Sequence, residues 1–133
     1  MFSIDAVAKY AAGLPGVTVG ARWGNRTWFV GDRGFIWQRP FSKADLKRFG
    51  DEPAPSGDIL GVIVENLDAK DALLAMNLPG FFTIEHFNGY AAVLVALKVA
   101  RAADVRAAIL GAHRVAVSAA MVKKPKKRRA RRA

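Results

Sequence analysis

The last eleven residues hold a dense group of basic side chains that is suited to binding polyanions. Eight Lys and Arg residues occur there without a single carboxylate. Flexible cations of this kind bind phosphates by releasing counterions, and they do so without recognising a base sequence. They are Lys123, Lys124, Lys126, Lys127, Arg128, Arg129, Arg131 and Arg132. Because like charges repel and little apolar surface offsets the entropy cost of ordering, we expect residues 121–133 to form a disordered tail.

A second group of cations lies between residues 22 and 48, where seven Lys and Arg residues stand against two Asp residues. Six of these are candidate phosphate contacts: Arg22, Arg26, Arg33, Arg39, Lys43 and Lys47. Trp23, Trp28 and Trp37 lie among them, and aromatic rings beside cations can stack on unpaired bases. The alternative is that the tryptophans turn into the core while the cations are simply solvated. The sequence leaves both interpretations open.

Glu85 and His86 are the one pair of neighbouring side chains suited to acid–base chemistry, and Asn88 and Tyr90 follow closely. His86, Asn88 and Tyr90 therefore form a candidate small-molecule site. Against this, adjacent strand residues point to opposite faces, so Glu85 and His86 are poorly placed to share a proton. A structural role for His86 beside a turn is the stronger interpretation.

The motifs of common catalytic and cofactor sites are absent from the sequence. It has no glycine pattern of a dinucleotide site or a P-loop, and none of its four serines lies in a G-x-S-x-G motif. Two histidines and no cysteine leave too few ligands for a closed zinc site. We therefore expect no metal, no cofactor and no enzymatic activity.

The remainder of the chain has the composition of one small domain. Without the eight tail cations, 13 Lys and Arg residues stand against 11 Asp and Glu residues, so the tail carries most of the net charge of +10. About 120 residues can bury one core, and we expect a single domain at residues 1–120. The longest clean apolar run, residues 90–97, is too short to span a bilayer, and the lack of cysteine is typical of a reducing compartment. We expect a cytoplasmic protein without membrane contact.

Local signals predict four helices. Ser3 is suited to begin the first helix, and Gly13 is suited to end it in a left-handed conformation. Ser42 is likewise suited to cap the second helix, with Phe41 packed against Leu46. The predicted helices span residues 4–12, 42–49, 66 or 68 to 76, and 102–120.

Six strands are predicted from β-branched and aromatic runs that are separated by turn residues. The first three should form an antiparallel meander, and the continuous apolar run at 59–64 suits a strand covered on both faces. Asn88 and Gly89 favour a type I′ hairpin turn because both tolerate positive φ. The predicted strands span residues 17–23, 26–30, 34–38, 59–64, 81–87 and 90–98. This order indicates an α+β fold in two layers, with an antiparallel sheet and helices packed mainly on one face.

Four segments carry a recognisable family pattern: Trp23-Gly24-Asn25 leading to Trp28, residues 35–40, residues 43–48, and residues 81–90 with 93–95. Together they resemble the YjbR-like (MmcQ/YjbR) family of small bacterial proteins over nearly all of residues 3–120. The resemblance implies a compact two-layer α+β domain of the secretion-chaperone-like type. It also implies a DNA-binding role without a cofactor or an assigned reaction. The basic tail lies outside the shared domain.

These observations predict a non-enzymatic protein that binds nucleic acid nonspecifically, with DNA favoured over RNA. Its contacts would come from the tail and from the basic strands. The alternative is a protein-interaction module without a nucleic-acid role, whose acidic partner would satisfy the tail equally well.

Overall fold

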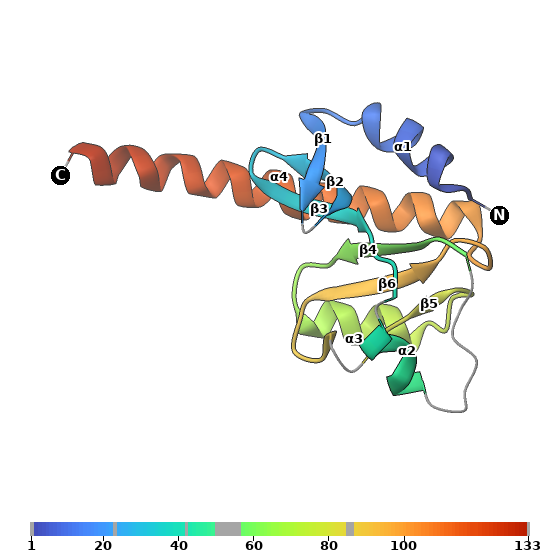
Figure 1. Ribbon diagram of the computed structural model, residues 1–133. Coiled ribbons are helices and arrows are strands. Elements are labelled where there is room, and N and C mark those ends of the chain that lie inside the picture. Colours follow the sequence, from blue (N-terminus) through green and yellow to red (C-terminus); the bar gives the residue numbers. More distant parts are fainter. Residues whose placement is uncertain (1, 23, 42, 50–56, 85–86, 133) are drawn as a thin grey trace.

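The computed structural model describes residues 2–22, 24–41, 43–49, 57–84 and 87–132, and for residues 44, 48 and 120–132 it describes the backbone alone (Figure 1). Over these ranges the chain is an α+β structure with one sheet. The helices and strands are α1 (Ile4–Ala12), β1 (Val17–Arg22), β2 (Asn25–Val30), β3 (Arg33–Gln38), α2 (Lys43–Phe49), β4 (Ile59–Ile63), α3 (Leu67–Ala75), β5 (Phe81–Phe82), β6 (Ala92–Ala96) and α4 (Ala102–Arg132).

All neighbouring strands of the described sheet run antiparallel, in the order β1-β2-β3-β4-β6-β5. The first three form the expected meander. Gly24 and Gly31 take positive φ at its two turns, 78° and 62°, which a glycine adopts without a steric penalty. The α+β fold with an antiparallel sheet, predicted from the sequence, is confirmed.

One side of the sheet, which we call the helical face, is aliphatic and lies against α4. Register pairs Ile36 with Val62, Val62 with Val93, and Leu60 with Val95, so these five side chains share this face. All five are almost fully buried. From α4 the core receives side chains three or four residues apart, namely Val105, Ile109, Ala112 and Ala116. Side chains of α1 and α3 pack on the same core, so helices cover mainly this face.

The opposite side, which we call the aromatic face, carries Trp37, Leu94 and Phe82. Gly61 of β4 lies beneath Trp37, since a Cβ added at Gly61 would come within 2.3 Å of the indole ring. Phe41, which precedes α2, packs here against Phe82 with their ring centroids 6.1 Å apart. A short helix and aromatic rings therefore cover this face.

Helix starts follow the sequence signals closely. Ser3 Oγ accepts a hydrogen bond from the Ala6 amide at 3.1 Å, and Asn66 Oδ1 accepts one from the Ala69 amide at 2.8 Å. The left-handed stop predicted at Gly13 is wrong: Gly13 has φ −80°, and Gly16 takes the positive φ of 74° instead. The chain first closes a tighter turn, with the Gly13 amide donating to the Tyr10 carbonyl.

The second helix is placed as predicted. Ser42 lies outside the described residues. Phe41 contacts Phe49 at a centroid distance of 5.2 Å, and Leu46 is 49% exposed. Phe41 turns toward the aromatic face, where a larger apolar surface is available.

The predicted long hairpin with an Asn88-Gly89 turn is also wrong. β5 has two residues and pairs only with β6, and Asn88 does not have the positive φ that a type I′ turn requires. The Nζ atom of Lys70 in α3 donates to the carbonyls of Phe87, at 2.6 Å, and Tyr90, at 2.9 Å. These carbonyls are therefore bonded to a side chain rather than to a neighbouring strand.

The last helix is longer than predicted. The sequence predicts a helix end near residue 120, whereas the backbone of α4 continues to Arg132. Ala, Lys and Arg have high helix propensity, and cations near a helix C-terminus interact favourably with its dipole. Figure 1 shows this final segment, in red, extending past the sheet without a neighbouring element. Because this segment carries like charges and Pro125 disfavours a helix interior, we expect its helix to exchange readily with disordered chain, in agreement with the predicted tail.

Candidate nucleic-acid interface

The eight basic residues of the tail follow one another along the projecting end of α4. They lie within the ten consecutive positions 123–132, and no acidic residue lies among them. At a rise of about 1.5 Å per residue, this segment is roughly 15 Å long. The tail cations are therefore brought together on one element, at a distance from the sheet (Figure 1).

The cations of residues 22–47 do not lie together on one element. Arg33 follows the β2–β3 turn, whereas Arg26 and Arg39 lie at the other end of these strands. Five residues of strand separate the two ends, which corresponds to about 17 Å. The predicted basic surface is thus divided into separate groups, with Arg33 isolated from Arg26 and Arg39.

Several of these cations are held by other groups of the protein. The Arg22 guanidinium lies 5.8 Å from the centre of the Phe29 ring. Arg26 donates from Nε to Gln38 Oε1 at 3.0 Å and lies 5.4 Å from the Trp28 ring. Such contacts position the guanidinium groups along the strands.

Arg39 is the most strongly held of the predicted cations. Its Nη1 atom donates to Asp45 Oδ2 at 2.9 Å and to the Pro40 carbonyl at 2.6 Å. The side chain of Asp45 is 2% exposed and that of Arg39 is 17% exposed, so the ion pair is largely shielded from water. This pair joins α2 to the end of β3. The basic pattern of residues 22–48 predicts Arg39 only as a phosphate contact, and it does not mark this ion pair.

Arg26 and Arg39 also line a small polar hollow of about 190 Å³. Gln38 and the Gly24-Asn25 turn contribute to its wall, and Asp58 is its one carboxylate among the described residues. Because Arg39 is paired with Asp45, the charges of Arg26 and Arg39 are balanced by those of Asp45 and Asp58. Lys43 and Lys47, one helical turn apart on α2, are both exposed. These groups form the remaining basic surface on the body of the protein.

The tryptophans differ from one another. Trp28 is fully buried in the core, as one of the two interpretations requires. Trp37 is only half-buried, and its ring stacks with those of Phe87, at a centroid distance of 6.4 Å, and Tyr90, at 6.3 Å. Trp23 lies outside the described residues. We call Trp37, Phe87 and Tyr90 the aromatic shelf.

Of the candidate small-molecule site, the structure describes Asn88 and Tyr90, whereas His86 lies outside the described residues. Asn88 and Tyr90 are exposed, and neither lines the polar hollow. Tyr90 instead belongs to the aromatic shelf, which joins residues about fifty positions apart in the chain. Sequence spacing did not reveal that proximity.

Lys70 is a buried cation that the sequence analysis missed. Lys70 lies on α3 and is 5% exposed. Its Nζ atom donates hydrogen bonds to the carbonyls of Phe87 and Tyr90. Burial lowers the pKa of Lys70 from its usual value of 10.5, and the nearby Asp71 carboxylate partly opposes this shift. Lys70 thereby fixes the backbone that carries two rings of the aromatic shelf.

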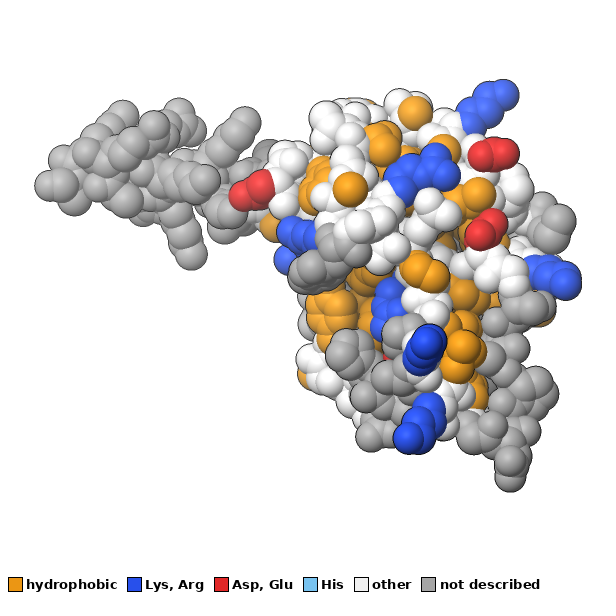
Figure 2. Space-filling view, viewed as in Figure 1, with side chains coloured by type: hydrophobic (Ala, Val, Ile, Leu, Met, Phe, Trp, Pro, Cys, Tyr) orange, Lys and Arg blue, Asp and Glu red, His pale blue; other side chains and the backbone are white. Residues whose placement is uncertain are grey.

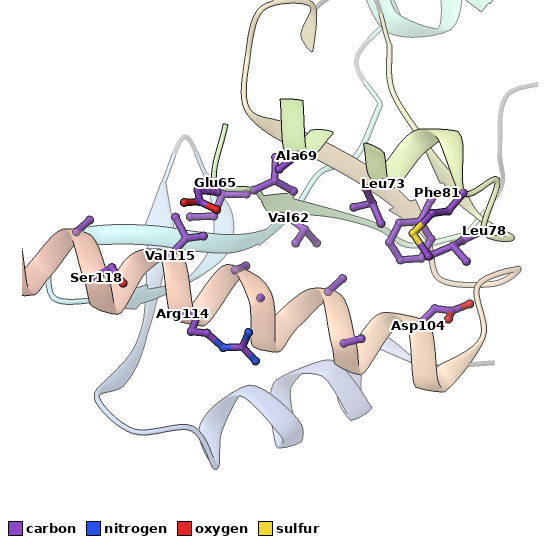
Figure 3. A pocket seen from close by; sticks show the side chains of 18 residues that line it. Val62, Glu65, Ala69, Leu73, Leu78, Phe81, Asp104, Arg114, Val115 and Ser118 are labelled. Atoms are coloured by element: carbon purple, nitrogen blue, oxygen red, sulfur yellow. The ribbon is translucent and has the colours of Figure 1, made fainter. Parts of the chain in front are cut away.

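A larger groove of about 1080 Å³ lies between α3 and α4, over the end of β4. Figure 3 shows Val62, Leu73 and Phe81 facing α4 across it. The groove is lined mainly by apolar side chains, with Glu65, Asp104 and Arg114 as its charged members. Of the residues predicted as functional whose side chains the structure describes, none lines this groove.

Similar proteins occur in mycobacteria. The uncharacterized protein Rv2570 of Mycobacterium tuberculosis and the uncharacterized protein Mb2600 of Mycobacterium bovis are each 44% identical to this chain over 100 residues. That region covers 73% of this chain and 74% of each relative. The chain belongs to the same family as these mycobacterial proteins. No protein-family model and no solved structure matches it.

For this member of the mycobacterial family, function must be argued from the site, since the names of the relatives state no activity. Across the described part of the chain, no group of three or more His, Asp or Glu side chains is placed to hold a metal ion. Within the same part of the chain, no helix is both long enough and apolar enough to cross a membrane.

Proposed function

We propose that this protein is a non-enzymatic nucleic-acid-binding protein whose basic end of α4 contacts the phosphate backbone of DNA. In this proposal the protein is cytoplasmic and belongs to the MmcQ/YjbR group that its sequence resembles. Its binding is nonspecific, because Lys and Arg contacts to phosphates position a protein without reading base edges.

The position of the eight tail cations carries the proposal. They lie on a segment of α4 that extends beyond the sheet, and no carboxylate lies among them. A projecting cationic segment can approach a polyanion without the body of the protein interfering. Neutralising several phosphates at once releases counterions, which supplies most of the affinity of nonspecific binding.

Ordering of this segment as a helix on binding would favour DNA over RNA. The major groove of B-form DNA is about 12 Å wide and admits an α-helix. In A-form RNA the major groove is deep and narrow, so a helix is excluded from it. We therefore expect stronger binding to duplex DNA than to duplex RNA of the same sequence.

The cations of the strands have a smaller role in this proposal. Arg39 is engaged with Asp45, and Arg26 is engaged with Gln38, so both are less available than a free side chain. Arg33, Lys43 and Lys47 are exposed, yet Arg33 lies at the opposite end of the strands from the polar hollow. They would add to an affinity that the tail provides.

The test compares the full-length protein with a variant in which the eight tail cations are replaced by Gln. Gln has a helix propensity close to that of Lys and Arg, so the backbone preference is retained. Binding to a fluorescent duplex is measured by anisotropy. The proposal predicts that affinity falls by at least about 100-fold, because up to eight phosphate contacts are lost.

Two outcomes oppose the proposal. Equal affinity of the two proteins would show that the tail does not bind DNA. Absence of binding by both would favour the protein-interaction module. A control replaces Lys9 and Lys98, two exposed cations outside the proposed contacts, by Gln and should change the affinity little.

A further inference from the structure

The three rings of the aromatic shelf differ in exposure in a way that suits base stacking. Phe87 is 4% exposed and forms the support, whereas Tyr90 is 45% exposed at the surface. The Phe87 and Tyr90 centroids are 5.4 Å apart, and the Trp37 and Tyr90 rings are inclined by 30°. An aromatic ring that is supported from below and open above is the usual platform for an unpaired base.

A cation borders this shelf on the side of the polar hollow. The Arg39 guanidinium lies 5.6 Å from the centre of the Phe87 ring and also lines the hollow, so the shelf and the hollow are adjacent. Both described hydrogen bonds of the Arg39 side chain use Nη1. Arg26 also lines the hollow, but its guanidinium bonds to Gln38 and lies near Trp28, on the helical face of the sheet, so Arg39 is the cation beside the shelf. Figure 2 shows Lys and Arg side chains among hydrophobic ones over α2 and the neighbouring strands.

The shelf is also held in place before any ligand binds. Lys70 holds the carbonyls of Phe87 and Tyr90, and the Arg39–Asp45 pair joins α2 to β3. A site whose backbone is already fixed loses less entropy when a ligand binds. This arrangement fits a binding surface, because the exposed Tyr90 ring itself contributes little to the core.

We propose that the aromatic shelf and the polar hollow form a second binding site, which is specific for single-stranded nucleic acid. An unpaired base stacks on Tyr90, and a neighbouring phosphate binds at the guanidinium of Arg39, whose Nη1 atom is held by Asp45. The inference rests on the proposed function for the class of ligand, but its residues are separate from the tail. A base held in a duplex cannot reach the ring, so this site contributes to single-strand binding alone.

The test uses full-length protein, a fluorescent oligothymidine and a duplex of equal length. Tyr90→Ala should weaken binding to the single strand about tenfold and leave duplex binding unchanged, as expected for the loss of one stacked base. Tyr90→Phe should bind like the wild type, since the ring is kept. Met76→Ala, at a residue of the α3 end that is 64% exposed, is the control and should have no effect.

A second measurement tests the phosphate contact. Arg39→Lys keeps a cation beside Asp45 but lacks the second guanidinium nitrogen, so it should weaken single-strand binding. Arg26→Gln, at a side chain on the helical face, should change the affinity little. The inference is overturned if Tyr90→Ala binds the single strand like Tyr90→Phe. It is also overturned if the wild type does not bind the single strand, or if Tyr90→Ala weakens single-strand and duplex binding equally.

These results are distinguishable from failure of the proposed function. If the eight-Gln tail variant binds duplex DNA like the wild type, the tail proposal fails. The shelf is judged independently by comparing Tyr90→Ala with Tyr90→Phe on the single strand. If the tail variant loses affinity and the two Tyr90 variants bind alike, the tail proposal stands and the shelf is refuted.

Discussion

The helical and aromatic faces of the same sheet differ in how completely their side chains are covered. On the helical face, Ile36, Leu60 and Val93 are fully buried beneath α4 and its neighbours. On the aromatic face, Trp37 is half-buried and Tyr90 is exposed, with Arg39 beside them. Aliphatic residues that are closed off from water stabilise the fold. On the aromatic face the Arg39–Asp45 pair and Phe87 are largely shielded from water, so the exposed Tyr90 ring is the part of this face that is available to a ligand.

The sharpest test of the helical face compares two neighbouring residues of α4. Ile109 is fully buried and Leu110 is 37% exposed. Ile109→Ala should lower the free energy of unfolding by about 2–5 kcal/mol, because it removes buried methyl groups and leaves a cavity. Leu110→Ala should cost less than about 1 kcal/mol. Urea unfolding measures both, and equal losses would contradict the assignment of the covered face.

The aromatic face is tested at Gly61. A Cβ there would come within 2.3 Å of the Trp37 ring, so Gly61→Ala must displace the indole or the strand. We expect a loss of about 1–3 kcal/mol in the free energy of unfolding. A change in tryptophan fluorescence should accompany it. A variant with unchanged stability and an unchanged spectrum would show that the indole does not lie against β4.

Lys70 links α3 to the aromatic shelf, and Lys70→Met tests that link. At neutral pH the variant should lose about 1–2 kcal/mol, because the two hydrogen bonds from the ammonium are lost, while both carbonyls keep a backbone donor, the amides of Tyr90 and Ala92. The pKa of Lys70 is lowered by burial, so in the pH range between the folded-state pKa and 10.5 the unfolded chain binds more protons. In that range the stability of the wild type should rise with pH relative to that of the variant. A difference that does not change up to pH 10.5 would contradict the buried ammonium.

The smallest expected effect is at Gly111, where α4 borders the groove. No atom lies within 4 Å of a Cβ added there, so alanine fits without displacing anything. Gly111→Ala should raise the free energy of unfolding by about 0.5–1 kcal/mol through its higher helix propensity. Thermal unfolding measures the gain. A destabilised variant would mean that the groove is filled in solution.

Local signals in the sequence predicted much of the fold, because the contacts involved are local. The caps of Ser3 and Asn66 depend on residues three positions away, and the meander depends on its glycine turns. The hairpin at Asn88 was predicted by the same reasoning and failed. There the carbonyls of Phe87 and Tyr90 are bonded by Lys70, which lies 17 and 20 residues earlier in the chain, and no local pattern marks such a contact.

The tail and the aromatic shelf also differ in whether their residues are close together in the sequence. The tail was visible as a run of charge, because its cations are consecutive in the chain. The aromatic shelf was not, because Trp37 meets Phe87 and Tyr90 only after the sheet forms. Arg39 is a further example. The basic composition of residues 22–48 predicts a phosphate contact for Arg39, whereas in the fold Arg39 forms an ion pair with Asp45.

The central claim, that the basic end of α4 binds the phosphates of DNA, is tested most directly by salt dependence. Affinity for a duplex is measured at several salt concentrations for the wild type and for the eight-Gln tail variant. If all eight cations bind phosphates, the wild-type slope of log affinity against log salt approaches roughly −7, from about −0.9 per contact. The variant should then show a much shallower slope, since only the cations of the body remain. Equal slopes for the two proteins would contradict the claim.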